Sequence, residues 1–241
     1  MLIVKNLKKK YKDFLALKGI SYEIKEGEIF GILGPNGAGK STMIKILTCF
    51  HKPTSGTVTI NDIPITNIKK IKPLIGWVPQ EETFYPKLTV KENLEYFASL
   101  YEIPRKEFKQ RSEEILRLLQ IEHKTHSLAG SLSGGMKRRL SIAIALIHNP
   151  KIIYLDEPTA GVDPVSRRAL WDIIRKIKQK GITILFCTHY LDEAELLCDR
   201  IAILRAGEII AINTPSKLKK EYKTLEEAFI KLVEHENNKI S

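Results

Sequence analysis

The most chemically informative part of the sequence is a glycine-rich loop. Residues 34–41 read GPNGAGKS, which fits the pattern GxxxxGK[ST] at every fixed position. An apolar run precedes this loop, and a segment with apolar residues at helical spacing follows it. Glycines allow consecutive backbone N–H groups to turn around phosphate oxygens, and a helix N-terminus adds partial positive charge there. The segment therefore predicts a strand, a phosphate-binding loop and a helix, with a glycine-rich turn that binds nothing as the alternative. In this interpretation Lys40 would reach the β- and γ-phosphates and Ser41 would ligate Mg²⁺.

A pair of adjacent carboxylates stands at the end of a second apolar segment. Asp156 and Glu157 follow residues 152–155, which read IIYL. Acids at the end of a buried strand need a partner, and a bound cation supplies one. We therefore expect Asp156 to hold Mg²⁺ through water and Glu157 to polarise the attacking water as general base. The alternative is that the two acids cap the following helix.

Two further apolar segments also lead to a polar residue. Residues 74–79 precede Gln80, and residues 184–188 precede His189. In open α/β sheets ligands gather at the carboxyl ends of the strands, so Gln80 and His189 should converge with the glycine loop and with Asp156 on one crevice. Taken alone, Gln80 or His189 is more often a satisfied polar group than a functional one.

The segment LSGGM at residues 132–136 predicts a second phosphate-binding feature. Ser133 is a good cap for the apolar helix expected around residues 140–147, and the two glycines leave backbone N–H groups accessible at a positive helix end. One nucleotide does not need two such cradles from one chain. Two chains that face each other head to tail would use both.

Hydrophobic periodicity predicts how these motifs are supported. Apolar and polar residues alternate over residues 4–24, which indicates short antiparallel strands, whereas residues 90–149 read as a mostly helical lobe. The apolar runs at 152–155 and 182–187 are separated by a helical pattern at 164–179. That order is typical of strands in a buried parallel sheet.

The composition describes one ordinary globular unit in a reducing compartment. The chain has 241 residues, 43% of them hydrophobic, and 3 cysteines that are far apart in sequence, so disorder and a disulfide scaffold are excluded. The longest apolar runs are far shorter than the ~20 residues that cross a bilayer. The N-terminus does not read as a signal peptide, and we expect a cytoplasmic protein.

The net charge of +11 suggests a nucleic-acid surface as an alternative. The basic clusters are short, dispersed and rarely interleaved with aromatic residues. We therefore expect no dedicated nucleic-acid surface. The clusters lie at residues 8–10, 69–72, 137–139 and 217–220.

The motifs GPNGAGKST, Gln80, LSGGM, IIYLDEP, AGVD and His189, in this order and at these spacings, resemble the nucleotide-binding subunit of an ATP-binding cassette (ABC) transporter. The resemblance covers essentially the whole chain. It implies an α/β fold with a P-loop NTPase (RecA-like) core, a mostly parallel sheet, an N-terminal antiparallel β subdomain and an α-helical subdomain. Residues 1–241 would form a single domain. Residues 1–88 and 150–213 would form its β-rich core, 89–149 its helical lobe and 214–241 a helical tail.

The resemblance also implies a role for each residue that matches a family motif. Gln80 would contact Mg²⁺ and the attacking water, Glu157 would be the catalytic carboxylate, and His189 would sense the γ-phosphate. Ser133, Gly134 and Gly135 would contact the γ-phosphate held by the opposite subunit. The loop that binds the triphosphate would comprise Gly34, Pro35, Asn36, Gly37, Ala38, Gly39, Lys40, Ser41 and Thr42.

Two positions outside these motifs have expected roles as well. Asp163 would lie in the loop that communicates across the dimer, and Tyr11 occupies the place of the aromatic residue that stacks on adenine. An ordinary strand tyrosine beside lysines is the alternative for Tyr11.

The implied cofactors are ATP and Mg²⁺, and the implied partners are a second ABC ATPase subunit, identical or merely similar, and integral-membrane permease subunits. The chain would then lie at the inner face of the cell membrane through its permease. Residues 81–93 would receive a permease helix with Phe84, Tyr85 and Leu88, or these side chains simply pack the lobes together. Met136, where the family more often has Gln, and the run LTVKENLEYFA resemble the exporter branch. The alternative function is a non-transport ABC-type ATPase that acts on nucleic acid.

Overall fold

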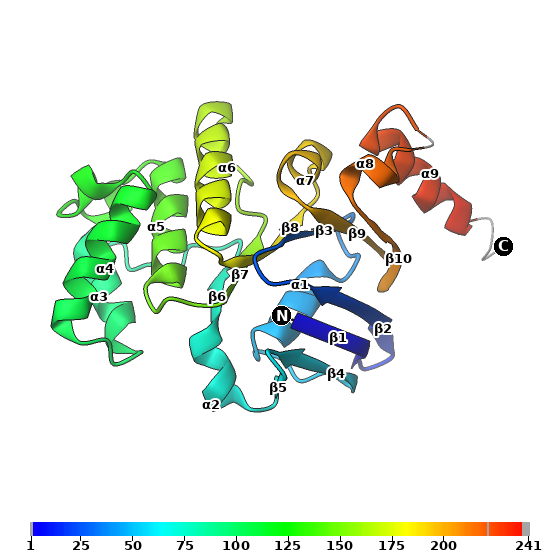
Figure 1. Cartoon of the computed structure of the whole chain (residues 1–241), viewed down its shortest axis with the longest axis horizontal. Helices are drawn as coiled ribbons and strands as arrows, with labels where there is room; N and C mark the ends of the chain where they lie inside the picture. The colour runs from blue at the N-terminus through cyan, green and yellow to red at the C-terminus, as the bar shows by residue number, and fades with distance from the viewer. Residues whose placement is uncertain (1, 221, 238–241) are drawn as a thin grey trace. The chain divides into compact units, whose positions relative to one another are not determined.

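The computed structural model describes residues 2–220 and 222–237, and the chain forms two compact units (Figure 1). The first unit comprises Met1–Ile71 and Thr183–Ser241, and the second comprises Lys72–Ile182. The helical lobe expected at residues 89–149 lies inside the second unit. In the described ranges, every helix is too short or too polar to span a bilayer.

The first unit begins with an antiparallel sheet, as the alternating pattern predicted. Strands β1 (Leu2–Tyr11) and β2 (Phe14–Ile24) form a hairpin, and β4 (Ser55–Ile60) and β5 (Ile63–Pro64) extend the sheet in the order β2-β1-β4-β5. Apolar residues of β1 and β2 are buried on one face while lysines stay accessible on the other. The hairpin turn places Tyr11 opposite Phe14.

The parallel strands of the first unit are the buried ones. β3 (Ile29–Leu33) lies between β8 (Thr183–Thr188) and β9 (Arg200–Arg205) and runs parallel to both, and β10 (Glu208–Asn213) pairs antiparallel with β9. Every residue of β3 and β8 is buried, which explains why their sequences are continuous apolar runs. Helices α1 (Lys40–Leu47) and α7 (Leu191–Leu197) follow β3 and β8, and α2 (Ile68–Ile71) is a single turn.

The tail is helical, as expected. It forms α8 (Pro215–Leu218) and α9 (Leu225–Asn237); α9 packs on α7 and α8, and its Leu225 and Ala228 are buried. The last tail residues, 238–241, lie outside the described residues.

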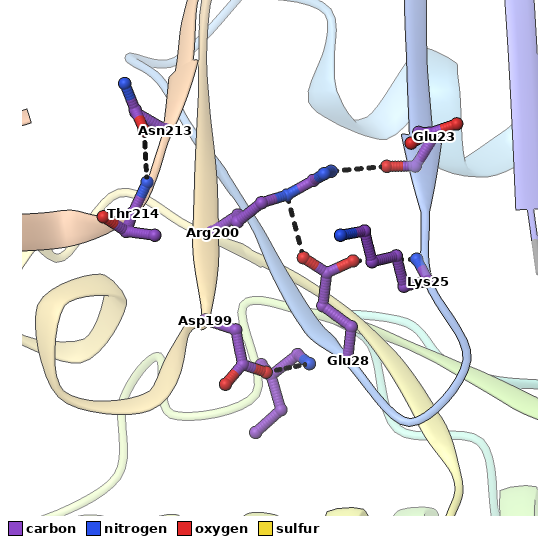
Figure 2. A network of polar contacts seen from close by, with 8 residues as sticks. Glu23, Lys25, Glu28, Asp199, Arg200, Asn213 and Thr214 are labelled. Carbon is purple, nitrogen blue, oxygen red and sulfur yellow. Dashed lines mark hydrogen bonds and ion pairs between the residues drawn. The ribbon is translucent and has the colours of Figure 1, made fainter. Parts of the chain in front are cut away.

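A network of polar contacts joins the beginning of β3 to the strands around it (Figure 2). Arg200 forms an ion pair with the buried Glu28 at 2.9 Å, and its Nη2 donates to the carbonyl of Glu23 at 2.6 Å. Asp199 accepts the backbone N–H of Ile29 at 2.8 Å, and Glu28 accepts that of Lys25 at 2.8 Å. A buried carboxylate needs such partners, so these contacts fix where β3 starts.

The second unit combines two parallel strands with a group of helices. β6 (Ile75–Val78) pairs with β7 (Ile152–Asp156), and α6 (Pro164–Gln179) follows β7. Helices α3 (Val90–Ser99), α4 (Arg105–Leu118) and α5 (Gly134–Leu146) pack on one another (Figure 1). Short 3₁₀ turns lie at Lys72–Leu74, Glu122–Lys124 and Ala129–Ser131.

A half-buried histidine joins the end of this helical group to β6. The Nε2 atom of His148 donates to the carbonyl of Ile75 at 2.8 Å, and its ring stacks on Tyr101 at 3.9 Å between centroids. Within the described part of the chain, the buried Nδ1 has no hydrogen-bond partner. Burial lowers the pKa of His148 below its ordinary value of 6.5, and the nearby Arg111 adds to this effect, although the bond to Ile75 opposes it. His148 therefore stays neutral where an exposed histidine titrates.

We predict that His148 makes the protein less stable in mild acid. The unfolded chain binds a proton near pH 6.5 and the folded chain only at lower pH, so the contribution is complete above 6.5 and is lost as the pH falls towards the folded pKa. The slope reaches at most about 1.4 kcal/mol per pH unit. Urea denaturation at pH 7 and 5.5 should show that the wild type loses more stability between these two pH values than His148→Gln does. The glutamine keeps a donor for the carbonyl of Ile75. An identical pH dependence of the two proteins would contradict this prediction.

Candidate functional site

The glycine loop connects β3 to α1 in the first unit, as predicted. Gly39 caps α1 in the left-handed conformation, with φ of 110°. An added Cβ there would lie 2.9 Å from the carbonyl oxygen of Ala16, so the close approach of β2 also requires glycine. Gly37 has φ of 80° and open space around its Cα. Packing explains Gly39, whereas the bare backbone at Gly37 leaves room for a ligand to approach.

Lys40 and Ser41 occupy the first turn of α1 in two different environments. Lys40 is 5% exposed, and its ammonium donates to the carbonyls of Gly34 at 2.7 Å and Pro35 at 3.2 Å. The positive charge is therefore held against the loop backbone. Ser41 is exposed, so its hydroxyl is accessible at the helix N-terminus. This combination of a buried cation, a helix end and an open hydroxyl is suited to phosphate oxygens and a cation bound to them.

His189 follows the strand beside the glycine loop. Leu33 of β3 lies opposite Thr188 of β8, so the loop and His189 begin at the same edge of the parallel strands. The hydroxyl of the buried Thr188 donates to the buried carboxylate of Glu193 at 3.0 Å and accepts the backbone N–H of Tyr190 at 3.0 Å. These bonds fix the backbone on both sides of His189, whose own side chain is exposed.

Tyr11 presents an accessible ring at the tip of the first hairpin. It is 38% exposed, with the ammonium of Lys9 at 5.0 Å from the ring centroid and the ring of His51 at 5.9 Å. An exposed aromatic face beside a cation can stack on a planar base. The placement is compatible with the expected role, which stays a prediction.

The second unit brings Gln80, Asp156 and Glu157 to one edge of its two strands. Val78 lies opposite Leu155, so Gln80 and Asp156 follow at corresponding ends of β6 and β7. Asp156 is 8% exposed and Glu157 is half-buried. Glu157 has φ of 46°, in the left-handed region that non-glycine residues seldom adopt. The catalytic candidate is therefore held in an unfavourable backbone conformation.

Arg138 is a half-buried cation whose role was not predicted from the sequence. Its guanidinium donates to three backbone carbonyls, those of Pro79 at 2.5 Å, Asp156 at 2.7 Å and Pro158 at 2.8 Å. In the sequence it belongs to the short basic cluster at residues 137–139, which gave no reason to expect a specific partner. The signal that could have identified it is a polar face, formed by Gly134, Lys137, Arg138 and Ser141 at helical spacing, on an otherwise apolar helix.

The LSGGM segment forms the N-terminus of α5, as predicted. Ser133 caps the helix by accepting the backbone N–H of Met136 at 3.4 Å. Gly134 has nothing within 4 Å of an added Cβ, whereas a Cβ on Gly135 would lie 2.7 Å from Ser166 of α6. Glycine is thus explained differently at the two positions. Gly135 allows α5 and α6 to pack closely, and Gly134 leaves the backbone N–H groups at the helix end accessible.

Asp163 connects the loop after β7 to this arrangement. It caps α6 by accepting the backbone N–H groups of Val165 at 3.1 Å and Ser166 at 2.9 Å. Hydrogen bonds from the hydroxyl and backbone of Ser166 lower the pKa of Asp163, so its carboxylate stays charged. Ser166 therefore donates to Asp163 and also lies against Gly135, so it connects the Asp163 loop to the LSGGM segment.

The predicted site residues therefore occur in two sets. The glycine loop, His189 and Tyr11 belong to the first unit, and Gln80, Asp156, Glu157 and the LSGGM segment belong to the second. Each unit arranges its polar residues at the carboxyl ends of parallel strands or at a helix N-terminus. The convergence of both sets on one nucleotide stays a prediction.

Comparisons with known proteins agree with these motifs. A family model described as "ABC transporter" matches residues 17–160. The linearmycin resistance ATP-binding protein LnrL of Bacillus subtilis is 42% identical over 219 residues, which cover 90% of this chain and 70% of that protein. The Nod factor export ATP-binding protein I of Burkholderia orbicola is 39% identical over 215 residues, 89% of this chain and 71% of that protein.

Other matches are to parts of longer proteins or to solved structures. Human ATP-binding cassette sub-family A member 2 is 44% identical over 222 residues, but the chain spans only 9% of its length. The dimeric structure of an ATP-binding cassette in a post-hydrolysis state, bound to ADP and Pi, superposes with a TM-score of 0.79 at 34% identity. That superposition covers 89% of this chain and 98% of the other.

We predict that the two glycines of the LSGGM segment differ in their effect on stability. Gly135→Ala should lower the free energy of unfolding by about 1–3 kcal/mol, because its methyl group would overlap Ser166. Gly134→Ala should change it by less than about 1 kcal/mol, because the site is open and alanine favours the helix. Urea denaturation of both variants tests this order. Equal destabilisation by the two substitutions would show that Gly135 is not a packing position.

Proposed function

The chain belongs to the ABC transporter family, and we propose that it powers transport by closing head to tail with a second cassette over two ATP molecules. It is an ATP-binding subunit that hydrolyses ATP to drive transport. The observation that supports the head-to-tail arrangement is the bare N-terminus of α5. Ser133 caps this helix, Gly134 leaves its N–H groups open, and the chain already has a phosphate-binding loop at Lys40. A similar cassette forms a dimer with ADP and Pi.

In this proposal each chain contributes to both nucleotide sites. The glycine loop and Lys40 bind the β- and γ-phosphates of one ATP, and the α5 N-terminus of the partner covers its γ-phosphate. Tyr11 stacks on the adenine. Hydrolysis separates the γ-phosphate, which contacts both chains, from ADP. ATP therefore favours the closed dimer, and its products favour the open one.

Two residues position and activate the attacking water, and two others contact the phosphate. Glu157 accepts a proton from the water as general base, Gln80 orients the water, and His189 contacts the γ-phosphate. Lys40 stabilises the negative charge that develops on the phosphate oxygens. The strained backbone of Glu157 and the fixed backbone around His189 support these roles, because both restrict where the side chains can point.

The cofactors would be ATP and Mg²⁺. Ser41, Gln80 and Asp156 offer a hydroxyl, an amide oxygen and a buried carboxylate, and such oxygen donors fit this ion. When bound, Mg²⁺ neutralises charge on the phosphates. Few protein ligands are needed because nucleotide phosphates and water usually complete its coordination.

The loop after Gln80 would receive the membrane partner. Tyr85 is 46% exposed, and its backbone is held by the buried Asn93, which accepts its N–H at 2.7 Å and donates to its carbonyl at 3.0 Å. Tyr96 lies at 4.9 Å from Tyr85 between ring centroids and is exposed as well. Phe84 is 7% exposed, so it supports the loop from inside rather than presenting a contact surface.

A permease helix on these aromatic side chains would place the chain at the inner face of the cell membrane. The direction of transport would be export, in line with the resistance and export names of two similar proteins. The second cassette is an identical copy in this proposal. If the permease co-purifies with this chain and with a second, different cassette, the working pair is heteromeric instead.

We predict that Glu157→Gln reduces ATP hydrolysis at least about 100-fold while ATP binding is retained, because the amide cannot accept the proton from water. The variant should accumulate as an ATP-bound dimer in size-exclusion chromatography. Glu26→Gln, an exposed glutamate in the first unit, is the matched control and should hydrolyse ATP normally. Normal turnover by Glu157→Gln would remove this residue from its role.

We also predict that Ser133→Arg prevents this dimer without affecting ATP binding by the monomer. The arginine removes the helix cap and fills the space where a partner's phosphate would approach. The double variant Ser133→Arg with Glu157→Gln should still bind a fluorescent ATP analogue, yet elute as a monomer. Ser216→Arg, also an exposed serine in the first turn of a helix, serves as control. A normal ATP-dependent dimer of the double variant would refute the head-to-tail arrangement.

A further inference from the structure

We propose that Arg138 is a positioning residue that fixes the backbone on both sides of Glu157 and at the start of the Gln80 loop. The inference rests on the proposed roles of Glu157 and Gln80, and it adds a residue that acts through the backbone of both segments. Arg138 donates to the carbonyls of Asp156 and Pro158, which flank Glu157, and to that of Pro79, which precedes Gln80. One side chain therefore holds both catalytic segments of the second unit.

The geometry of the guanidinium makes this arrangement specific. Its Nη2 atom lies 2.7 Å from the oxygen of Asp156, its Nε 2.8 Å from that of Pro158, and its Nη1 2.5 Å from that of Pro79. The donors of a planar guanidinium have fixed relative directions, so three such bonds determine the relative positions of the three carbonyls. A lysine ammonium is a single point and cannot span them in this way.

Glu157 requires such support because its backbone is unfavourable. Its φ of 46° is left-handed, and this conformation persists only where the surroundings determine it strongly. The two carbonyls that Arg138 holds belong to the residues directly before and after Glu157. The carbonyl of Glu157 itself accepts the N–H of Ala160 at 3.2 Å. Without Arg138, the peptide plane between Asp156 and Glu157 and the plane that follows Pro158 would each lose a hydrogen-bond donor.

The same helix carries the segment that would reach the partner's nucleotide. Arg138 lies one turn after Gly134 on the same face of α5, and this face borders a cavity of about 160 Å³ together with Gln80 and Gly161. Lys137 adds an ion pair with Glu82 at 3.2 Å. A displacement of α5 would therefore move the backbone of Glu157 and Gln80 with it.

Arg138 keeps its charge under working conditions. Burial lowers the pKa of Arg138 to about 10, although the Asp156 carboxylate partly opposes this effect. The guanidinium is thus protonated at neutral pH and donates all three bonds. Its partial burial reduces the competition of bulk water for these hydrogen bonds.

The test separates catalysis from binding and from folding. Arg138→Ala should lower kcat by at least about tenfold, because a displaced general base loses its alignment with the water. The affinity for a fluorescent ATP analogue should stay within about threefold of the wild type, since the phosphate-binding loop is unchanged. Arg139→Ala is the control, because Arg139 is the adjacent arginine and bonds only weakly to the Leu119 carbonyl, at 3.4 Å. Its kcat should stay within about twofold of the wild type.

A conservative variant covers the case in which Arg138→Ala does not fold. Arg138→Lys keeps the charge, and thermal denaturation should show a folded protein whose kcat lies between those of the wild type and Arg138→Ala. A folded Arg138 variant with wild-type kcat would overturn the proposal. So would a loss of kcat/KM that is entirely a loss of ATP affinity.

The outcome is distinguishable from failure of the proposed function. Glu157→Gln is measured in the same assay. If it is inactive while a folded Arg138→Ala turns over normally, only the positioning role is wrong. If Glu157→Gln itself turns over normally, the assignment of the general base fails, whatever Arg138 does.

Discussion

The register of the parallel strands is the constraint on which the rest of this structure depends. Leu33 lies opposite Thr188, and Val78 lies opposite Leu155. In each unit, two apolar strands therefore end at the same level, and the polar segments that follow them begin side by side. A shift by one residue would exchange the two faces of a strand and remove the polar residue from the edge. β3, β7 and β8 are buried along their whole length, and the observed register places the site residues at the ends of these strands.

Much of this arrangement could be predicted from the sequence because the signals are local. The glycine loop, the strand before it and the helix after it are contiguous, and the Ser133 cap precedes its helix directly. The backbone conformation of Gly39 also follows from its residue type, since glycine adopts positive φ at low cost.

The features that the sequence did not reveal depend on contacts between distant segments. Arg138 bonds to carbonyls 18, 20 and 59 residues away, and no local pattern indicates which backbone oxygens an arginine side chain will meet. The burial of Phe84 and the left-handed φ of Glu157 are set in the same way by tertiary packing. The different reasons for Gly134 and Gly135 likewise emerge only when α6 is placed beside α5.

The backbone of Glu157 sets folding stability against activity in this enzyme. Glycine or asparagine accepts a φ of 46° more readily than glutamate does, so either replacement would relieve strain in the native state while deleting the carboxylate. Selection for heat resistance alone would therefore favour glycine or asparagine at position 157, and the protein would lose its ATPase activity. The persistence of glutamate there would be evidence that turnover, rather than thermal endurance, is what the organism requires of the chain.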